Sequence, residues 1–234
     1  MKKILAISLA LIALAAPAFA DDDAAYSVNT IGVIKYTVPP GGQMICVSMP
    51  LNPPPDATDN IWGKTSLATQ LQPGSMVYFW DDVGQGWTGY SKLGSGRWSA
   101  AASNRVMVPG EAIFLKSPAT ATVDHVVSYI GELSTDETSD LSLTAASTLN
   151  ARGYSMYPVA PASGVFGDTY IATNVTAGSA VYFWDTEGQG WSGYSRLGSG
   201  RWNAAASNHP VQVGDGIFIK DSGSSRIIEE PRPF

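Results

Sequence analysis

Short runs of alternating apolar and polar residues, separated by glycine and proline, make up most of this chain. In residues 77–81 (VYFWD) the alternation places Val77 and Phe79 on one face of a strand and Tyr78 and Trp80 on the other. Helical periodicity is absent, and the chain contains 24 glycines and 15 prolines. The pattern predicts an all-β protein built from short antiparallel strands.

The same pattern is written twice. Residues 75–117 and 179–221 align at a constant offset of 104, and 28 of the 43 aligned positions are identical. The chain is therefore a tandem duplication. In the first copy we expect four strands, namely VYFWD, GWTGYSKL, RWSAAA and AIFLK, with a glycine-rich hairpin loop after the first of them.

The flanking segments complete each repeat. Residues 31–51 contain two apolar runs around a Pro-Pro-Gly-Gly turn, which indicates a hairpin, and the stretch 63–74 fits a short helix or strand. We predict two tandem homologous units, each small and barrel- or sandwich-like. The boundaries follow from internal matches: signal peptide 1–20, polar lead-in 21–30, β-repeat one 31–129, β-repeat two 130–221, and a C-terminal tail 222–234 that is a candidate edge strand.

The first twenty residues have the features of a bacterial Sec-type signal peptide. Lys2 and Lys3 precede an apolar run, and Ala18-Phe19-Ala20 gives a small-x-small cleavage site. No other segment approaches the roughly 18 apolar residues of a spanning helix, so we expect no membrane span after the signal is removed. The predicted location is secreted, periplasmic or at the cell surface.

Net charge and cysteine content limit the kinds of partner that we expect for this protein. The formal charge of −6 becomes −8 without the two lysines of the signal peptide, and no Lys/Arg cluster is present, which argues against nucleic acid. Cys46 is the only cysteine, so no internal disulfide can form. A buried thiol and a covalent bond to another subunit both stay open as explanations.

The motifs resemble a known group of sequences. A secretion signal, VYFWD, an aromatic hairpin ending in Arg-Trp, PGEAIFLK and Ile-Gly-Glu together are similar to uncharacterised secreted tandem β-repeat proteins of environmental bacteria. The likeness covers most of the mature chain. It implies an all-β repeat fold and brings no activity with it.

Catalytic and metal-binding patterns are absent from the sequence. His125 and His209 have no counterpart in the other copy, and no HExxH, Gly-x-Ser-x-Gly or Cys/His pairing occurs. Asp81 and Asp185 recur before the hairpin loop, where a side-chain cap on the turn explains them better than a calcium loop does. We expect no catalytic residue, no metal and no cofactor, and a hydrolase is the least favoured function.

The repeated hairpin carries the candidate ligand-binding residues. An aromatic face beside amide and guanidinium groups can bind sugars, and two copies would add avidity. The alternative is that these aromatic residues form the core and its rim; alternation assigns Trp87 and Leu93 to the core and Tyr90 and Lys92 to the surface. The candidate residues are Gln85, Tyr90, Arg97 and Trp98 in the first copy and Gln189, Tyr194, Arg201 and Trp202 in the second.

Assembly is the second class of function. Runs of β-forming residues at both ends of the chain would leave strand edges that can pair with other chains, giving a homo-oligomer, a filament or a surface layer. Pro231, Pro233 and the acidic pair Glu229-Glu230 oppose such pairing. The sequence thus favours a non-catalytic β-repeat protein that contacts glycans or another cell-surface protein, or that assembles with itself.

Overall fold

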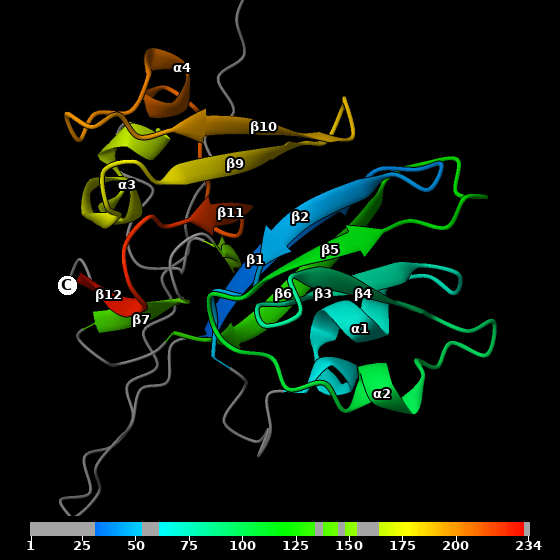
Figure 1. Cartoon of the computed structure of the whole chain (residues 1–234). Helices are drawn as coiled ribbons and strands as arrows, with labels where there is room; N and C mark the ends of the chain where they lie inside the picture. The colour runs from blue at the N-terminus through cyan, green and yellow to red at the C-terminus, as the bar shows by residue number, and fades with distance from the viewer. Residues whose placement is uncertain (1–30, 53–60, 134–137, 145–147, 154–163, 232–234) are drawn as a thin grey trace, which may run out of the picture.

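The computed structural model describes residues 31–52, 61–133, 138–144, 148–153 and 164–231. The predicted signal peptide and lead-in and most of the proline-rich segment after Asn52 lie outside these residues. Within them the chain is all-β, in two similar halves of antiparallel strands, as the pattern predicted. Of the two forms expected for the units, barrel-like and sandwich-like, the strands form no closed barrel. Figure 1 shows the first half in blue to green and most of the second in yellow to red.

Each half consists of a four-stranded sheet and a two-stranded ribbon. The first sheet has the order β2-β5-β3-β4 and the second the order β8-β11-β9-β10; the ribbons are β1-β6 and β7-β12. The strands of the first half are β1 (Ile31–Val38), β2 (Met44–Ser48), β3 (Met76–Asp81), β4 (Gly86–Ser91), β5 (Ala112–Lys116) and β6 (His125–Glu132). Those of the second are β7 (Thr138–Leu143), β8 (Leu149–Gly153), β9 (Ala180–Asp185), β10 (Gly190–Ser195), β11 (Gly216–Lys220) and β12 (Arg226–Pro231).

The apolar runs around the Pro-Pro-Gly-Gly turn do not form the expected hairpin. β1 pairs along its whole length with β6, and β2 pairs with β5. The turn residues Gly41 and Gly42 have φ values of 71° and 76°, which glycine adopts without strain. The turn therefore passes the chain from a ribbon into a different sheet, and the prediction of a local hairpin is wrong.

The third predicted strand, RWSAAA, is also wrong, because its alanines form helix α2 (Ala100–Ser103). The Ser99 side chain accepts a hydrogen bond from the Ala102 amide and so caps the helix, as Asn203 does for α4 (Ala204–Ser207). The ambiguous stretch before each sheet resolves into a 3-10 turn and a helix. These are η1 (Trp62–Lys64) with α1 (Ser66–Gln70), and η2 (Phe166–Asp168) with α3 (Tyr170–Asn174).

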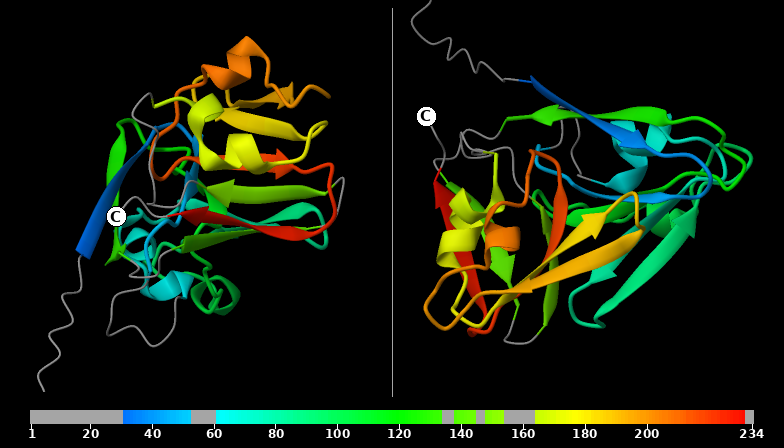
Figure 2. Two further views of the ribbon diagram at one scale, coloured as in Figure 1. Left: turned by 90° about the vertical axis from the view of Figure 1, so that its left-hand side faces the viewer. Right: turned by 90° about the horizontal axis from the view of Figure 1, so that it is seen from above.

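Strand pairing also shows where the two units meet along the chain. The strand β6 runs on to Glu132 and stays paired with β1, while β7 pairs with the C-terminal strand β12. The tail therefore fills in the second half the place that β6 fills in the first. Both views in Figure 2 show β1, in blue, at the border of the molecule.

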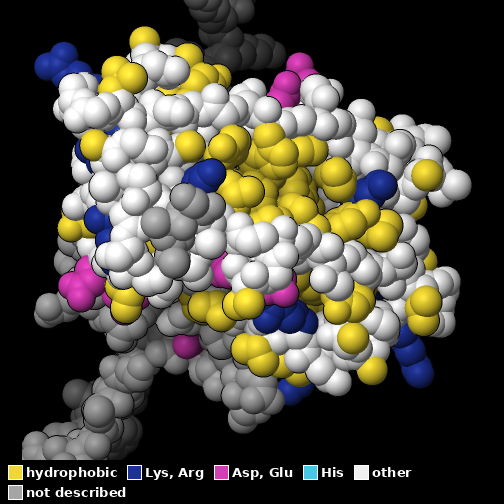
Figure 3. Space-filling model, viewed as in Figure 1, with side chains coloured by type: hydrophobic (Ala, Val, Ile, Leu, Met, Phe, Trp, Pro, Cys, Tyr) yellow, Lys and Arg dark blue, Asp and Glu magenta, His cyan; other side chains and the backbone are white. Residues whose placement is uncertain are grey.

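Each half has its own core, and a third cluster joins them. Val77 and Phe79 are buried under the helices of the first half, whereas Trp80, on the opposite face of β3, belongs to the cluster between the sheets. Two-sided burial of this kind explains why both faces of the VYFWD strand are apolar. In the view of Figure 3, apolar side chains gather in the region between β10 and β2.

Equivalent residues face each other where the two halves meet. Ser48 of β2 lies against Gly153 of β8, and Ala112 of β5 lies against Gly216 of β11. A Cβ atom on Gly153 would overlap the Ser48 side chain, and one on Gly216 would lie 3.1 Å from the Ala112 Cβ atom. Close packing of the halves therefore depends on small residues at these positions.

Candidate functional site

The two candidate tryptophans of the repeated hairpin are packing residues. Trp98 is 8% exposed, donates its indole N–H to the Ala68 carbonyl over 2.9 Å, and lies edge-on to Trp62 at 5.4 Å. Trp202 is half-buried and makes the equivalent bond to Ala172 over 2.9 Å. These contacts use the faces and the N–H groups that a sugar ring would need, so packing within each half accounts for both residues.

The two candidate glutamines join the halves. The Gln85 side chain donates to the Leu149 carbonyl (3.0 Å) and accepts from the Leu149 amide (2.7 Å). Gln189 does the same to the backbone of Met44, at 3.0 Å and 2.8 Å. Leu149 begins β8, an edge strand of the second sheet, and Met44 begins β2, an edge strand of the first. Each glutamine amide therefore bonds edge-strand backbone groups of the half to which it does not belong. We call these paired contacts the glutamine clasp.

Backbone conformation fits the same role. Gln85 and Gln189 have φ values of 51° and 49° and are the only non-glycine residues with positive φ among those described. Each follows an aspartate whose side chain accepts an amide hydrogen bond two residues on, from Val83 to Asp81 (2.9 Å) and from Glu187 to Asp185 (3.0 Å). The predicted aspartate cap is thus confirmed, and the loop sequence Gly-Gln-Gly is explained by the contact it makes.

The aromatic cluster between the sheets is the second element of the junction. Trp80 contacts Phe218 of the other half at 4.7 Å, and in the symmetric arrangement Phe114 contacts Trp184 at 4.7 Å. The indole N–H of Trp80 donates to the Leu149 carbonyl (3.0 Å). Trp87 belongs to this junction and is half-buried. The sequence assigned it to a core, and the core it joins is the one shared by the two halves.

Two neighbouring residues were assigned to the wrong side of the strand. Leu93, expected in the core, is 53% exposed, and Lys92, expected at the surface, is buried. The Lys92 ammonium donates to three carbonyl groups at the end of α1, and burial lowers its pKa. Arg196 takes the same place in the second half, where it donates to the carbonyl groups of Thr173 and Val175.

The other four candidate residues are two half-buried tyrosines and two exposed arginines. Tyr90, expected at the surface, packs against the first core with its ring centroid 5.9 Å from that of Phe79. Tyr194 packs in the same way on the second core. Arg97 and Arg201 extend into solvent from the turns after β4 and β10. Of the eight candidates, Tyr90 alone lines the cleft described next.

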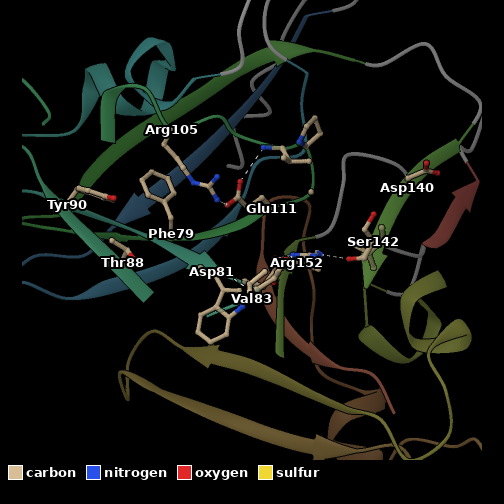
Figure 4. Close-up of a pocket in the computed structure, with 17 residues that line it drawn as sticks. Phe79, Asp81, Val83, Thr88, Tyr90, Arg105, Glu111, Asp140, Ser142 and Arg152 are labelled. Carbon is tan, nitrogen blue, oxygen red and sulfur yellow. Dashed lines mark hydrogen bonds and ion pairs between the residues drawn. The ribbon is translucent and has the colours of Figure 1, made fainter. Parts of the chain in front are cut away.

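That cleft has a volume of about 510 Å³ and runs between the two halves. Figure 4 shows Tyr90 at one end and Asp140 at the other, with the remaining labelled side chains between them. Its walls come from β3, β4, the loop before β5, β7 and β8. The lining residues are Phe79, Trp80, Asp81, Asp82, Val83, Thr88, Tyr90, Arg105, Val108, Pro109, Gly110, Glu111, Asp140, Leu141, Ser142, Ala151 and Arg152.

Two ion pairs shape the cleft. The Arg105 guanidinium donates to Glu111 over 2.8 Å and lies 5.6 Å from the centre of the Phe79 ring. Arg152 of the second half donates to Asp82 of the first over 2.8 Å. Burial raises the pKa of Glu111, against the opposing effect of Arg105. Hydrogen bonds from the Gly84 and Val83 amides lower the pKa of Asp81. Sequence reasoning missed these residues because the cleft brings together parts of both repeats.

The equivalent place in the second half holds a much smaller cavity of about 120 Å³. His209 replaces Arg105 there and stacks on Phe183, with ring centroids 3.7 Å apart. Asp215 replaces Glu111, and burial raises its pKa to about 6. Cys46 lines this cavity as a free thiol whose pKa is raised by burial. The duplication has therefore produced two unequal sites.

Comparison with known proteins adds no assignment: no family model, no curated protein and no solved structure matches the chain. Among the described residues, histidine, cysteine, aspartate and glutamate nowhere group in the threes that a metal ion would need. The same residues contain no helix with the length and apolar character needed to cross a membrane.

Proposed function

We propose that this protein is a non-catalytic, secreted or cell-surface binding protein that holds a glycan in the cleft between its two halves. The observation that carries the proposal is the cleft of about 510 Å³, whose wall combines aromatic rings with hydrogen-bonding groups. Ligand sites of proteins have volumes of roughly 300–1,000 Å³ and occur preferentially at domain interfaces.

The form of the cleft favours a chain of sugars over a compact ligand. Tyr90 and Thr88 line the end in the first half, and Ser142 and Asp140 line the end in the second (Figure 4). Between the ends lie the carboxylates of Asp81 and Asp82, which can accept hydrogen bonds from sugar hydroxyls. The half-buried Tyr90 ring supplies an apolar surface for one ring of the ligand.

One site per chain replaces the two that the duplicated sequence suggested. The cavity in the second half is about 120 Å³, less than a quarter of the first, and Tyr194 does not line it. Avidity from two equal sites within one chain is therefore not part of the proposal. Of the eight candidate residues, only Tyr90 keeps a role in ligand contact.

The test compares Tyr90→Ala with Tyr194→Ala. Both tyrosines pack on the core of their own half in the same way, so the two changes perturb folding alike. We expect glycans identified on an array to bind the mature protein and the Tyr194 variant equally, and the Tyr90 variant at least tenfold more weakly by calorimetry. No glycan binding, or an equal loss in both variants, would rule out the cleft as a glycan site.

Self-assembly by strand addition is the second candidate function, and β1 favours it. Among the residues that the structure describes, β1 pairs with β6 only, whereas the outer edge of β6 is covered by Gln70, whose side chain bonds both the amide and the carbonyl of Ser128. The solvent face of this ribbon is apolar at Ile31, Val33 and Ile130. An open edge beside an apolar face suits antiparallel addition of β1 from a second copy of the chain.

Light scattering on the mature protein tests assembly. Val33 and Ile227 are exposed to the same degree, 56% and 57%, on the ribbons of the first and second halves. We expect association that grows with concentration, is lost in Val33→Lys and persists in Ile227→Lys. A monomer at every concentration would refute assembly through β1.

A further inference from the structure

The cations of the cleft are already used within the protein. Arg152 donates through Nε to the Ser142 carbonyl (2.8 Å), through Nη1 to the Ala151 carbonyl (2.9 Å) and through Nη2 to Asp82 (2.8 Å). Arg105 is held by Glu111. A ligand with carboxylate or sulfate groups would have to break these ion pairs, because each guanidinium is engaged by a carboxylate.

The carboxylates of the cleft exceed its cations. The lining contains Asp81, Asp82, Glu111 and Asp140 but only the two arginines, which gives a formal charge of −2. Asp140 is exposed on β7, and no lysine or arginine pairs with it among the described residues. The field at this end of the cleft therefore attracts cations.

The neighbour of Asp140 strengthens this field. Asp140 lies directly opposite Glu229 of β12 in the ribbon, and both side chains are exposed. At the equivalent places of the first ribbon, Lys35 lies opposite Ser128. Like charges directly opposite each other destabilise an antiparallel pair. The second half thus carries an unfavourable charge pair at the mouth of the cleft, where the first half carries none.

We propose that the glycan of this cleft bears protonated amino groups, as in a chain of amino sugars, and that Asp140 with Glu229 receives an ammonium group at the second-half end. The inference rests on the proposed glycan function and specifies the ligand's charge. The rings near Tyr90 contact the protein through their C–H faces, and the hydroxyl groups donate to Asp81.

Calorimetric titration with three probes tests the charge of the ligand: a β-1,4-linked glucosamine oligomer, its N-acetylated counterpart and a uronic acid oligomer. We expect the glucosamine oligomer to bind tightest, with an affinity that falls as salt is added, and the uronic acid oligomer to show no binding. Asp140→Asn should weaken glucosamine binding by roughly threefold to tenfold, the size expected for one exposed charge contact.

Asp124→Asn is the matched control, since Asp124 is an exposed carboxylate in the loop before β6, outside the cleft. The control should bind all probes as the unaltered protein does. Asp140→Asn should also melt at a slightly higher temperature, because it removes a like-charge pair, so a lower affinity cannot come from misfolding. Equal binding of amino and N-acetyl oligomers, unaffected by Asp140→Asn, overturns the ammonium site but leaves the glycan function standing. Preferred binding of the uronic acid oligomer likewise overturns the ammonium site and leaves the glycan function standing. If neither a probe nor any array glycan binds, the ammonium site and the glycan function are both overturned.

Discussion

Removal of one arm of the glutamine clasp should loosen the junction by a measurable amount. Gln189→Ala deletes two hydrogen bonds to the Met44 backbone, of 2.8 and 3.0 Å, and a third of 2.6 Å to the Thr186 carbonyl. A neutral hydrogen bond contributes about 0.5–1.5 kcal/mol net, so we expect a loss of about 1.5–4.5 kcal/mol in the free energy of unfolding. Alanine also keeps the cost of the positive φ of 49°, whereas Gln189→Gly removes that cost, which is about 1 kcal/mol. The glycine variant should therefore be the more stable of the two.

Urea unfolding followed by tryptophan fluorescence measures this difference. With a urea dependence of about 2 kcal/mol/M, a loss of about 2 kcal/mol lowers the midpoint by about 1 M. Gln212→Ala is the matched control, because Gln212 is an exposed glutamine of the same half and no hydrogen bond of its side chain is seen. A midpoint for Gln189→Ala equal to that of the control, or a glycine variant less stable than the alanine variant, would refute the reasoning.

Two further predictions concern the junction. Gly153→Ala places a Cβ atom against the Ser48 side chain and should destabilise the protein by about 1–3 kcal/mol in thermal unfolding. Adding Ser48→Gly to this variant should restore most of the lost stability. A double variant no more stable than Gly153→Ala alone would argue against this contact. Burial raises the pKa of Asp215 from 3.8 to about 6, so its contribution to stability is complete below about pH 3.8 and is lost as the pH rises through about 6. Asp215→Asn should accordingly raise the free energy of unfolding at pH 7.5 by about 3 kcal/mol at most, and the melting temperature with it, but change both little at pH 3.5. Calorimetry showing the same shift at both pH values would contradict the assignment.

The sequence predicted the elements whose determinants are local. VYFWD forms a strand with its two faces as expected, and the aspartate cap depends on an amide two residues away. The segment RWSAAA was misassigned because Trp98 resembles a strand residue, whereas the alanines and the Ser99 cap favour a helix. Alternation holds as far as Lys92, which lies on the same face of the strand as Tyr90. That face packs on the first core instead of facing solvent, so Lys92 points inward to the carbonyl groups of α1.

The candidate site was beyond the reach of sequence pattern for a different reason. The glutamine clasp joins Gln85 to Leu149 and Gln189 to Met44, which are 64 and 145 residues apart along the chain. The Gly-Gln-Gly loop is identical in the two copies, but each glutamine bonds backbone groups, and backbone partners cannot be inferred from residue types. Arg152 and Asp82 meet across the halves, and neither ion pair of the cleft recurs in the other copy.

Ser48 lies against Gly153, and this contact between unlike residues is possible because the two copies belong to one polypeptide. In a dimer of two identical chains, residues at a twofold axis meet their own copies, so the same place would hold serine against serine or glycine against glycine. Serine leaves no room for a second side chain there, and the pair fits only because the two partners differ. Joining the copies in one chain removed the requirement that they match. With that requirement gone, one copy could keep a wide cleft while its twin filled the corresponding space with a stacked histidine.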